Sequence, residues 1–402
     1  MTIWKEAQLG QYVDVKGGKR LPKGKNLVTE PTEHPYIRIR DLGKSKVIQL
    51  GKDYEYVDDE TQEKIERYIV DEGDIIISIV GTIGLVGIVG KTLDKANLTE
   101  NCVKLINIKE VDKEFLYYYL ISEFGQAEIK KGTVGAVQPK LPIKNIQSLV
   151  IKYPDIDEQK RICSIFTAID AKIDNNNQIN NNLLQQAAAL FESWFVNYDL
   201  WDGVQPPEWV NAPLGSFVEI KRGGSPRPIQ DYLSDSGLRW LKISDVTSLS
   251  SPFVLKIKEH IKEGGLRKTV FLKKGELVLS NSATPGIPKI LDVDSCIHDG
   301  WLYFPKSELS KYYLYLFFNH IHKELVALGN GSVFTNLKTD ILKAFPVTKA
   351  DSVTLKEFDS LVTPFFDAML NVDRENFKLT AIRDALLPKL MSGEIDVSDI
   401  QL

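Results

Sequence analysis

Two long stretches of the chain place apolar side chains at alternating steps of four and three residues. The first stretch begins at Asp155 and ends at Phe195, and no Pro or Gly follows until Gly203. Asp155 can accept from the first free backbone N–H groups of a helix, and Glu158 can reach back to the cap. The spacing predicts one helix of roughly 60 Å at about 1.5 Å per residue. A core helix of a single globular domain is the alternative, but ordinary helices run only about 8–20 residues.

Each stretch carries the heptad seam of a coiled coil. The seam positions of the first are Ile162, Phe166, Ile169, Ile173, Asn176, Asn180, Leu183, Ala187, Leu190 and Trp194. Those of the second are Phe358, Val362, Phe365, Met369, Val372, Asn376, Leu379, Arg383, Leu386 and Leu390.

Polar residues inside these seams are expected to set the register of the coil, and they are Asn176, Asn180 and Asn376. If the helices pair antiparallel about their midpoints, Asn176 lies opposite Asn376. Proline is expected to disturb the second helix twice. Pro364 predicts a kink, or a restart after a Thr363 cap, and Pro388 should disturb the last turn.

The regions upstream of the two stretches also repeat each other. KGGKRLPKG from Lys16 corresponds to KRGGSPRPI from Lys221, and YIRIRDL from Tyr36 corresponds to WLKISDV from Trp240. Short β-rich runs alternate with Gly and Pro turns in both regions, and one helical stretch follows in each. The sequence therefore predicts an α+β fold: two duplicated modules with mixed β-sheet, each followed by a long helix that carries a coiled-coil seam.

The same patterns predict five segments. They are a first module at 1–154, a central long helix at 155–201, a linker at 202–212, a second module at 213–350 and a C-terminal long helix at 351–395. The linker follows from the Pro pair and the lack of periodicity in WDGVQPPEWV.

Composition limits the class of protein. With 402 residues, 43% of them hydrophobic, and a net charge of -4, the chain has the size of two ordinary domains, and any nucleic-acid surface must be local. Its three cysteines are too few for a disulfide framework, which fits a reducing cytoplasm. The start lacks a signal-peptide pattern, and the apolar run from Ile75 is short and broken by glycines.

Four patterns could suggest catalysis, and each has a simpler interpretation. PDIDEQK at Pro154 places its carboxylates in one helical turn, which favours capping over a nuclease metal site. QPPEW at Gln205 lacks the leading Asn or Asp of an amino-methyltransferase motif. GTIGLVG at Gly81 is followed by β-branched residues, which favours a hairpin turn over a phosphate loop. The Cys and His residues show no metal-ligand spacing. No catalytic or metal-binding residue is predicted.

The repeated Gly-rich loops are basic although the whole chain is acidic. Arg and Lys on such loops suit phosphate contacts and guanine recognition, whereas Asn and Gln suit adenine. A solvated basic loop is the alternative, and the recurrence of the loop at the same place in both modules leaves the two interpretations balanced. The candidate DNA contacts are Lys16, Lys19, Arg20, Lys23, Lys25, Arg38, Arg40, Thr82, Gln138, Lys140, Lys221, Arg222, Arg227, Lys242, Ser244, Asn281, Ser282, Thr335 and Asn336.

The order of these motifs resembles the specificity (S) subunit of type I restriction-modification systems. The resemblance covers nearly the whole chain and rests on the GG loops, IRIRDL and LKISDV, GDIIIS, VGAVQPKLPIKNIQSLVIKYPDIDEQKRI and the closing DALLPKLMSGEI. The second half departs from the pattern, because AFPVTKADSVTLKEF has no Glu-Gln pair.

This resemblance implies a non-catalytic cytoplasmic adaptor with two target recognition domains, each reading one half of a bipartite double-stranded DNA site. It also implies that the two long helices separate these domains and pair as an antiparallel coiled coil. Two methylation (M) subunits would carry S-adenosylmethionine and methylate adenine N6. Restriction (R) subunits would add ATP- and Mg-dependent translocation and cleavage. The alternatives are a tandem-repeat scaffold that binds only proteins, which would show no salt-dependent DNA affinity, and an enzyme in its own right. The target bases and the spacer length cannot be predicted from the sequence.

Overall fold

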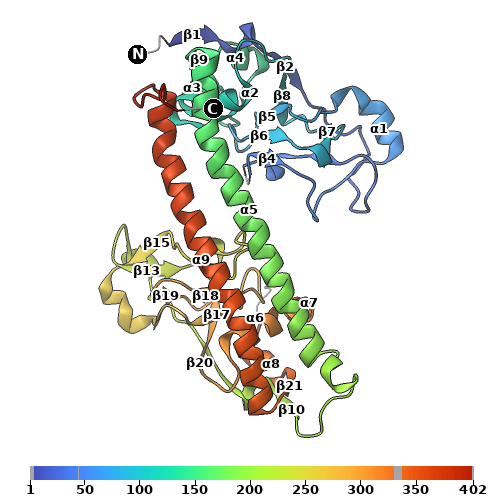
Figure 1. Ribbon diagram of the computed structural model, residues 1–402, viewed down its shortest axis with the longest axis vertical. Coiled ribbons are helices and arrows are strands. Elements are labelled where there is room, and N and C mark those ends of the chain that lie inside the picture. The colour runs from blue at the N-terminus through green and yellow to red at the C-terminus, as the bar shows by residue number, and fades with distance from the viewer. Residues whose placement is uncertain (1–3, 44, 330–336, 401–402) are drawn as a thin grey trace. The chain divides into compact units, whose positions relative to one another are not determined.

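The computed structural model describes residues 4–43, 45–329 and 337–400 (Figure 1). The chain divides into two compact units, one formed by residues 1–172 with 379–402 and the other by residues 173–378. Each unit contains one module and part of both long helices.

The main sheet of the first module has the strand order β2-β8-β5-β6-β4. Its strands are β2 (Asp14–Gly17), β8 (Cys102–Ile106), β5 (Ile75–Ser78), β6 (Val86–Val89) and β4 (Val47–Ile48). All neighbours are antiparallel except β4 and β6, which run parallel. The turn between β5 and β6 is the hairpin predicted around Gly81, and this prediction is confirmed.

The second module repeats this topology with the order β11-β20-β17-β18-β14. Its strands are β11 (Val218–Arg222), β20 (Trp301–Ser307), β17 (Leu277–Ser280), β18 (Pro288–Leu291) and β14 (Phe253–Val254). As in the first module, the last strand in this order joins its neighbour in parallel, β14 with β18. The duplication predicted from the sequence is therefore present in all five strands of the main sheets.

Smaller sheets complete the modules and fix the correspondence between them. Parallel β3 (Tyr36–Ile37) and β7 (Asn97–Leu98) match parallel β13 (Leu238–Leu241) and β19 (Ser295–Ile297). In the second module, β12 (Leu233–Ser234), β15 (Glu259–Ile261) and β16 (Val270–Leu272) extend this smaller sheet. Each module also has a two-stranded sheet that joins its first and last strands. These are β1 (Lys5–Gln8) with β9 (Val150–Tyr153), and β10 (Val210–Pro213) with β21 (Pro346–Lys349). In this register Tyr36 corresponds to Trp240, and Thr99 corresponds to His298.

Short helices follow the sheets in the same sequence. They are α1 (Asp59–Ile65), α2 (Lys113–Ile121), α3 (Glu123–Gly132) and α4 (Ile143–Gln147) in the first module, and α6 (Lys311–His320), α7 (His322–Gly329) and α8 (Thr339–Ala344) in the second. Asp112 caps α2 and Ser310 caps α6, each through the N–H three residues on.

The two long helices are α5 (Ile156–Phe195) and α9 (Ser352–Met391), with 40 residues each. Asp155 accepts from the backbone N–H of Glu158 at 3.0 Å, as predicted for the cap. The cap of α9, which the sequence left uncertain, is Asp351, whose Oδ1 accepts from the N–H groups of Val353 and Thr354.

The restart of the second helix after a Thr363 cap was wrong, because α9 continues through both Pro364 and Pro388. The alternative, a kink at Pro364, stays a prediction. A proline inside a helix costs about 3 kcal/mol. Apolar packing on both sides of Pro364 offsets this cost, since Val362 and Phe366 are fully buried and Phe366 stacks on Tyr312 at 4.4 Å between ring centroids.

Within each unit, α5 and α9 run side by side and antiparallel (Figure 1). In the second unit the Asn176 side chain donates a hydrogen bond to Asn376 at 2.8 Å, and Asn180 donates to Asp373 at 2.7 Å. In the first unit Arg383 donates to Asp170 at 3.1 Å.

Two seam positions are shifted from the prediction. Phe191 and Phe366 are buried, whereas Leu190 and Phe365 are only half-buried. A 3.6-residue helix drifts relative to a strict heptad, and this face packs on α6, where Phe191 meets Tyr313 at 5.2 Å.

No helix among the described residues is long and apolar enough to cross a membrane. Cys102, Cys163 and Cys296 are buried free thiols.

Candidate nucleic-acid interface

The Gly-Gly loop of the first module lies directly on the segment between β7 and β8. Gly18 N–H donates to Cys102 O at 3.1 Å, and Lys19 N–H donates to Leu98 O at 2.8 Å. A Cβ on Gly18 would lie 2.1 Å from Thr99 O, so only glycine permits this approach.

The second module holds its loop through equivalent contacts. Gly223 N–H donates to Trp301 O at 2.8 Å, and Gly224 N–H donates to Ile297 O at 3.2 Å. A Cβ on Gly223 would lie 2.2 Å from His298 O. The repeated glycines therefore place two basic loops at the same position of two equivalent sheets.

A carboxylate at the equivalent position of each module binds the loop. In the first module it is Glu100, whose Oε1 accepts from Arg20 Nε at 2.7 Å and whose Oε2 accepts from the Thr99 hydroxyl at 3.1 Å. Burial alone would raise the pKa of the Glu100 carboxyl, but the hydrogen bonds from Arg20, from its own backbone N–H and from Thr99 together outweigh burial, so the pKa lies below its usual value. Glu100 is therefore ionised at neutral pH and holds Arg20 in place.

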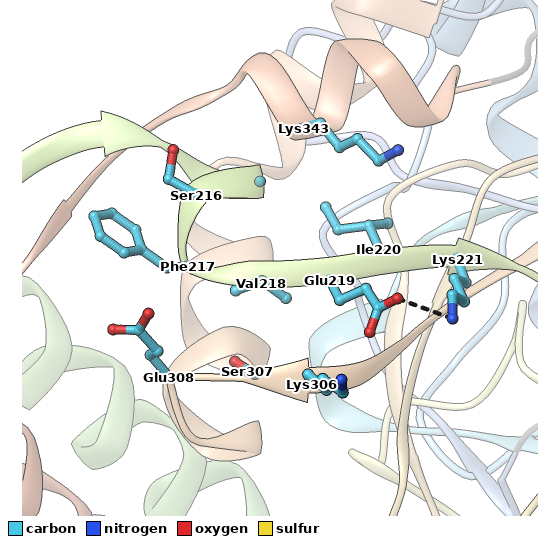
Figure 2. A pocket seen from close by; sticks show the side chains of 11 residues that line it. Ser216, Phe217, Val218, Glu219, Ile220, Lys221, Lys306, Ser307, Glu308 and Lys343 are labelled. Carbon is cyan, nitrogen blue, oxygen red and sulfur yellow. Dashed lines mark ion pairs between the residues drawn. The ribbon is translucent and has the colours of Figure 1, made fainter.

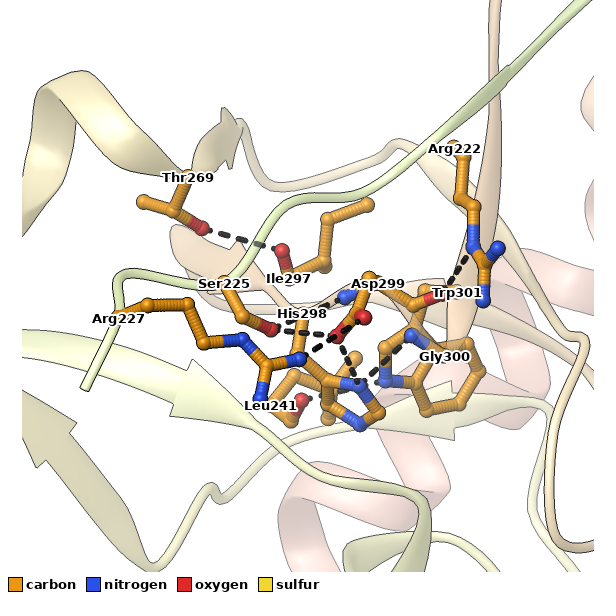
Figure 3. A network of polar contacts seen from close by, with 10 residues as sticks. All are labelled: Arg222, Ser225, Arg227, Leu241, Thr269, Ile297, His298, Asp299, Gly300 and Trp301. Atoms are coloured by element: carbon orange, nitrogen blue, oxygen red, sulfur yellow. Dashed lines mark hydrogen bonds and ion pairs between the residues drawn. The ribbon is translucent and has the colours of Figure 1, made fainter. Parts of the chain in front are cut away.

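In the second module the carboxylate is Asp299 (Figure 3). Ser225 Oγ donates to its Oδ1 at 2.5 Å, a terminal nitrogen of Arg227 lies 3.3 Å from its Oδ2, and Arg222 Nε donates to its backbone oxygen. Burial opposes ionisation of Asp299, but the Ser225 hydroxyl and the charge of Arg227 lower its pKa below the ordinary value. One acidic residue thus binds three positions of the basic loop.

Several other candidate cations also lie beside carboxylates. The pairs are Lys25 with Asp58 and Glu60, Arg38 and Arg40 with Glu55, Lys221 with Glu219, and Lys242 with Glu259. Such exposed or half-exposed pairs contribute little stability. They hold the cationic side chains in place, and a phosphate could take over from the carboxylate as partner.

Four candidate lysines have no ion pair within the described residues: Lys16, Lys19, Lys23 and Lys140. All four are exposed, and Lys19 Nζ lies 5.4 Å from the centre of the Tyr68 ring. Thr82, Gln138, Arg222 and Ser244 are exposed as well. These side chains are accessible to a ligand.

Three candidates differ from the rest. Asn281 is only 2% exposed, and its backbone oxygen accepts from Leu337 N–H, so it is not part of the accessible surface. The sequence did not reveal this burial, because the residue lies in the turn after β17. Thr335 and Asn336 lie outside the described residues.

The hairpin turns after β5 and β17 are built alike. Ser78 Oγ donates to Thr82 O at 2.6 Å, and Ser280 Oγ donates to Thr284 O at 2.6 Å. The same hydroxyls accept from the N–H groups of Leu85 and Ile287. Thr82 and Ser282 are therefore carried on turns with the same internal hydrogen bonds.

Two hollows lie on the second module. One, of about 370 Å³, adjoins Asp299 and brings together the candidates Arg227, Lys242, Ser244 and Ser282 with Trp240 and His298. The other, of about 660 Å³, lies at the start of β11 (Figure 2). It is lined by Lys221, Lys306 and Lys343, and Lys221 Nζ pairs with Glu219 at 2.8 Å.

The sequence prediction missed four residues of this surface: Glu100, Trp240, His298 and Asp299. The sequence contains a signal for the carboxylates, because Glu100 and Asp299 each lie two residues before the strand that pairs with the loop strand. Alignment of the two repeats would have paired the carboxylates, whereas a search for cations passes over them. Among the described residues, no group of three or more His, Cys, Asp or Glu side chains could hold a metal ion.

Comparison with known proteins identifies the family. The type I restriction modification DNA specificity domain matches residues 1–185 and 206–348. The chain belongs to this family. It is therefore a specificity subunit of a type I restriction-modification system, a class of non-catalytic subunits. The assignment decides against the protein-binding scaffold and against an independent enzyme.

The relatives span most of the chain. The specificity subunit of the type I restriction enzyme MjaIX from Methanocaldococcus jannaschii is 24% identical and covers 91% of this chain and 88% of its own length. That of HindI from Haemophilus influenzae is 25% identical and covers 72% of this chain and 79% of its own. The crystal structure of an S subunit from M. genitalium aligns over 97% of this chain and 96% of its own with a TM-score of 0.55 and 17% identity, so the two share a fold.

Proposed function

We propose that this specificity subunit reads a bipartite double-stranded DNA target, with one half-site read by each module. The observation that carries the proposal is the repeated loop: Gly18 and Gly223 make equivalent backbone contacts, and Glu100 and Asp299 bind the basic side chains that follow. Two equivalent basic surfaces on one chain suit a ligand that presents two similar surfaces, as the half-sites of a duplex do.

Contacts on these surfaces divide into two chemical classes. The exposed lysines Lys16, Lys19, Lys23 and Lys140 suit phosphate, which positions the protein without selecting a sequence. Arg227, Ser244 and Ser282 share a hollow with aromatic residues, where the edge of a base can be selected.

The subunit would act within a larger complex. We infer that two M subunits carrying S-adenosylmethionine methylate adenine N6, and that R subunits using ATP and Mg dock on the same chain in the cytoplasm. The segments proposed from the sequence assign recognition to residues 1–154 and 213–350, with residues 202–212 as a linker. The assignment of coil register to Asn176, Asn180 and Asn376 likewise stays a proposal.

Two measurements test the proposal. Titration of the M-bound chain with duplex DNA should give an affinity whose logarithm falls linearly with the logarithm of salt concentration. Maps of methylated adenines in the host genome, with and without this chain, should show a two-part motif that disappears with the chain. Salt-independent binding, or a motif that persists without the chain, would contradict the proposal.

A further inference from the structure

His298 lines the hollow beside Asp299, and its ring orientation is fixed on three sides. The ring centroid lies 6.0 Å from that of Trp240 and 6.4 Å from that of Trp301, and Gly300 N–H donates to His298 Nδ1 at 2.8 Å (Figure 3). A Cβ on Gly300 would lie 2.2 Å from His298 Cε1. Only glycine at position 300 lets the ring occupy this place.

The contact with Gly300 also fixes the protonation of the ring. An N–H donor requires a lone pair on Nδ1, so Nε2 carries the ring proton. Burial lowers the pKa of His298 below its ordinary value, which favours the same neutral form at neutral pH. Within the described part of the chain no hydrogen-bond partner of Nε2 is recorded. His298 therefore presents one oriented N–H donor.

Arg227 supplies a second donor group to the same hollow. Its side chain is 73% exposed, and the contact with Asp299 engages one terminal nitrogen, which leaves the other guanidinium N–H groups available. The oxygens of Asp299 already accept from Ser225 and Arg227, and Lys242 pairs with Glu259. The hollow thus offers mainly donors to an incoming ligand.

Donors select among the bases in the major groove. Guanine presents two adjacent acceptors there, N7 and O6, whereas adenine combines an acceptor with a donor, cytosine presents a donor, and thymine presents one acceptor beside a methyl group. We propose that the second module reads a guanine at this hollow, with Arg227 and His298 Nε2–H as the donors to N7 and O6. The inference rests on the proposed function and adds the identity of one base.

The first module lacks this pair of donors. Thr99 stands where the second module has His298, and its hydroxyl donates to Glu100. The inference therefore applies to the half-site of the second module alone.

Two substitutions at His298 distinguish the loss of the Nε2–H donor from a disturbance of the fold. In His298→Asn the side-chain oxygen can replace Nδ1 as the acceptor for Gly300, but the Nε2–H donor is lost. In His298→Gln an amide N–H can reach the position of Nε2. A bidentate base contact is worth about 1–3 kcal/mol, or about 5- to 150-fold in discrimination. His298→Asn should lose discrimination in this range at one position of the second half-site, and His298→Gln should restore part of it.

The chemically altered duplex tests the contact without altering the protein. Once the methylation map gives the motif, each guanine of the second half-site is replaced in turn by 7-deazaguanine, which lacks the N7 acceptor. One replacement should slow methylation by the M-bound chain, and inosine, which keeps N7 and O6, should not. Thr99→Val, at the corresponding position of the first module, is the matched control for the His298 variants. It should leave base discrimination at the second half-site unchanged.

The outcomes separate this inference from the proposed function. A bipartite motif whose second half-site contains no guanine, or whose guanines all tolerate 7-deazaguanine, overturns the inference and leaves the proposed function standing. Equal, full discrimination by His298→Asn and His298→Gln overturns the role of His298. A map without any two-part motif overturns both.

Discussion

Asn176 Nδ2 donates to Oδ1 of Asn376 at 2.8 Å, which joins the middles of α5 and α9 within the second unit. Asn176 is 1% exposed, and the same nitrogen also donates to Glu375. The Asn176 Oδ1 atom is buried and has no hydrogen-bond partner. The contact therefore combines a specific pairing with an unsatisfied acceptor, which is the cost expected of a polar residue that fixes register.

Replacing both partners should stabilise the unit. Asn176→Leu with Asn376→Leu removes the unsatisfied Asn176 oxygen and both sides of the Asn176–Asn376 hydrogen bond, and we expect the free energy of unfolding to rise by about 1 kcal/mol. Asn176→Leu alone should lower it by about 1 kcal/mol, because Asn376 loses its donor. Thermal unfolding followed by circular dichroism measures both changes.

The register is tested in the same variants. Spin labels on the exposed positions Gln178 and Phe377 should show a broader distance distribution in the double variant than in the wild type. An unchanged distribution, or a destabilised double variant, would contradict a register role for this pair.

Asp170 should be essential for the first unit. It is 8% exposed and accepts from the Tyr118 hydroxyl at 2.6 Å and from Arg383 at 3.1 Å. Asp170→Ala leaves the half-buried Arg383 guanidinium with only the exposed Asp384 as a carboxylate partner and removes the acceptor of the Tyr118 hydroxyl, so we expect a loss of about 3 kcal/mol in urea unfolding. Asp170→Asn keeps an acceptor for Tyr118 and should lose less. Equal stability of Asp170→Ala and wild type would contradict this role.

The sequence predicted the features that depend on periodicity and repetition. The four-three spacing predicted both long helices, and the similarity of the Lys16 and Lys221 loops predicted a duplicated module. The structure adds that the two main sheets have the same strand order. It failed where tertiary packing decides, as at Pro364, where buried Val362 and Phe366 keep the helix continuous. It also missed Glu100 and Asp299, because a carboxylate that positions a cation becomes visible only when the chain brings the two together.

Lys289 should make the stability of the second unit depend on pH. Its ammonium group is buried and donates hydrogen bonds to the backbone oxygens of Leu249 and Ser251. Burial lowers the pKa of Lys289 to about 8. Because the pKa in the folded state lies below that of the unfolded chain, the protonated form destabilises the fold at pH values below about 8. This cost disappears between about pH 8 and the ordinary lysine pKa of about 10.4, a gain of up to about 3 kcal/mol.

The control for this effect is Lys289→Met, which cannot titrate. We expect the free energy of unfolding of the wild type to rise with pH across this window relative to that of Lys289→Met. Urea unfolding at pH 7, 8.5 and 10 measures this difference. A difference that stays constant, or that falls with pH, would rule out the buried ammonium as the cause.

Phosphate contacts should differ between free and paired cations of the first loop. Lys23 is exposed and has no ion pair within the described residues, so Lys23→Ala should lower the salt slope of DNA binding by about one unit. Arg20→Ala should weaken binding more, because it leaves the ionised Glu100 facing the duplex. Fluorescence anisotropy at several salt concentrations measures both variants.

Removing the carboxylate as well provides the matched control. Arg20→Ala with Glu100→Gln should bind DNA more tightly than Arg20→Ala alone, since the repulsion of phosphate is relieved. If the double variant binds no better than the single one, Glu100 does not face the DNA.

The most direct test of one half-site per module is an exchange of the second module. Residues 213–350 would be replaced by the corresponding segment of a relative with a known, different target, and methylated adenines would be mapped in a host that supplies the M subunits. We predict a motif that keeps the half-site of the first module and gains the other half-site from the relative. A motif that stays unchanged, or one in which both halves change, would contradict the account.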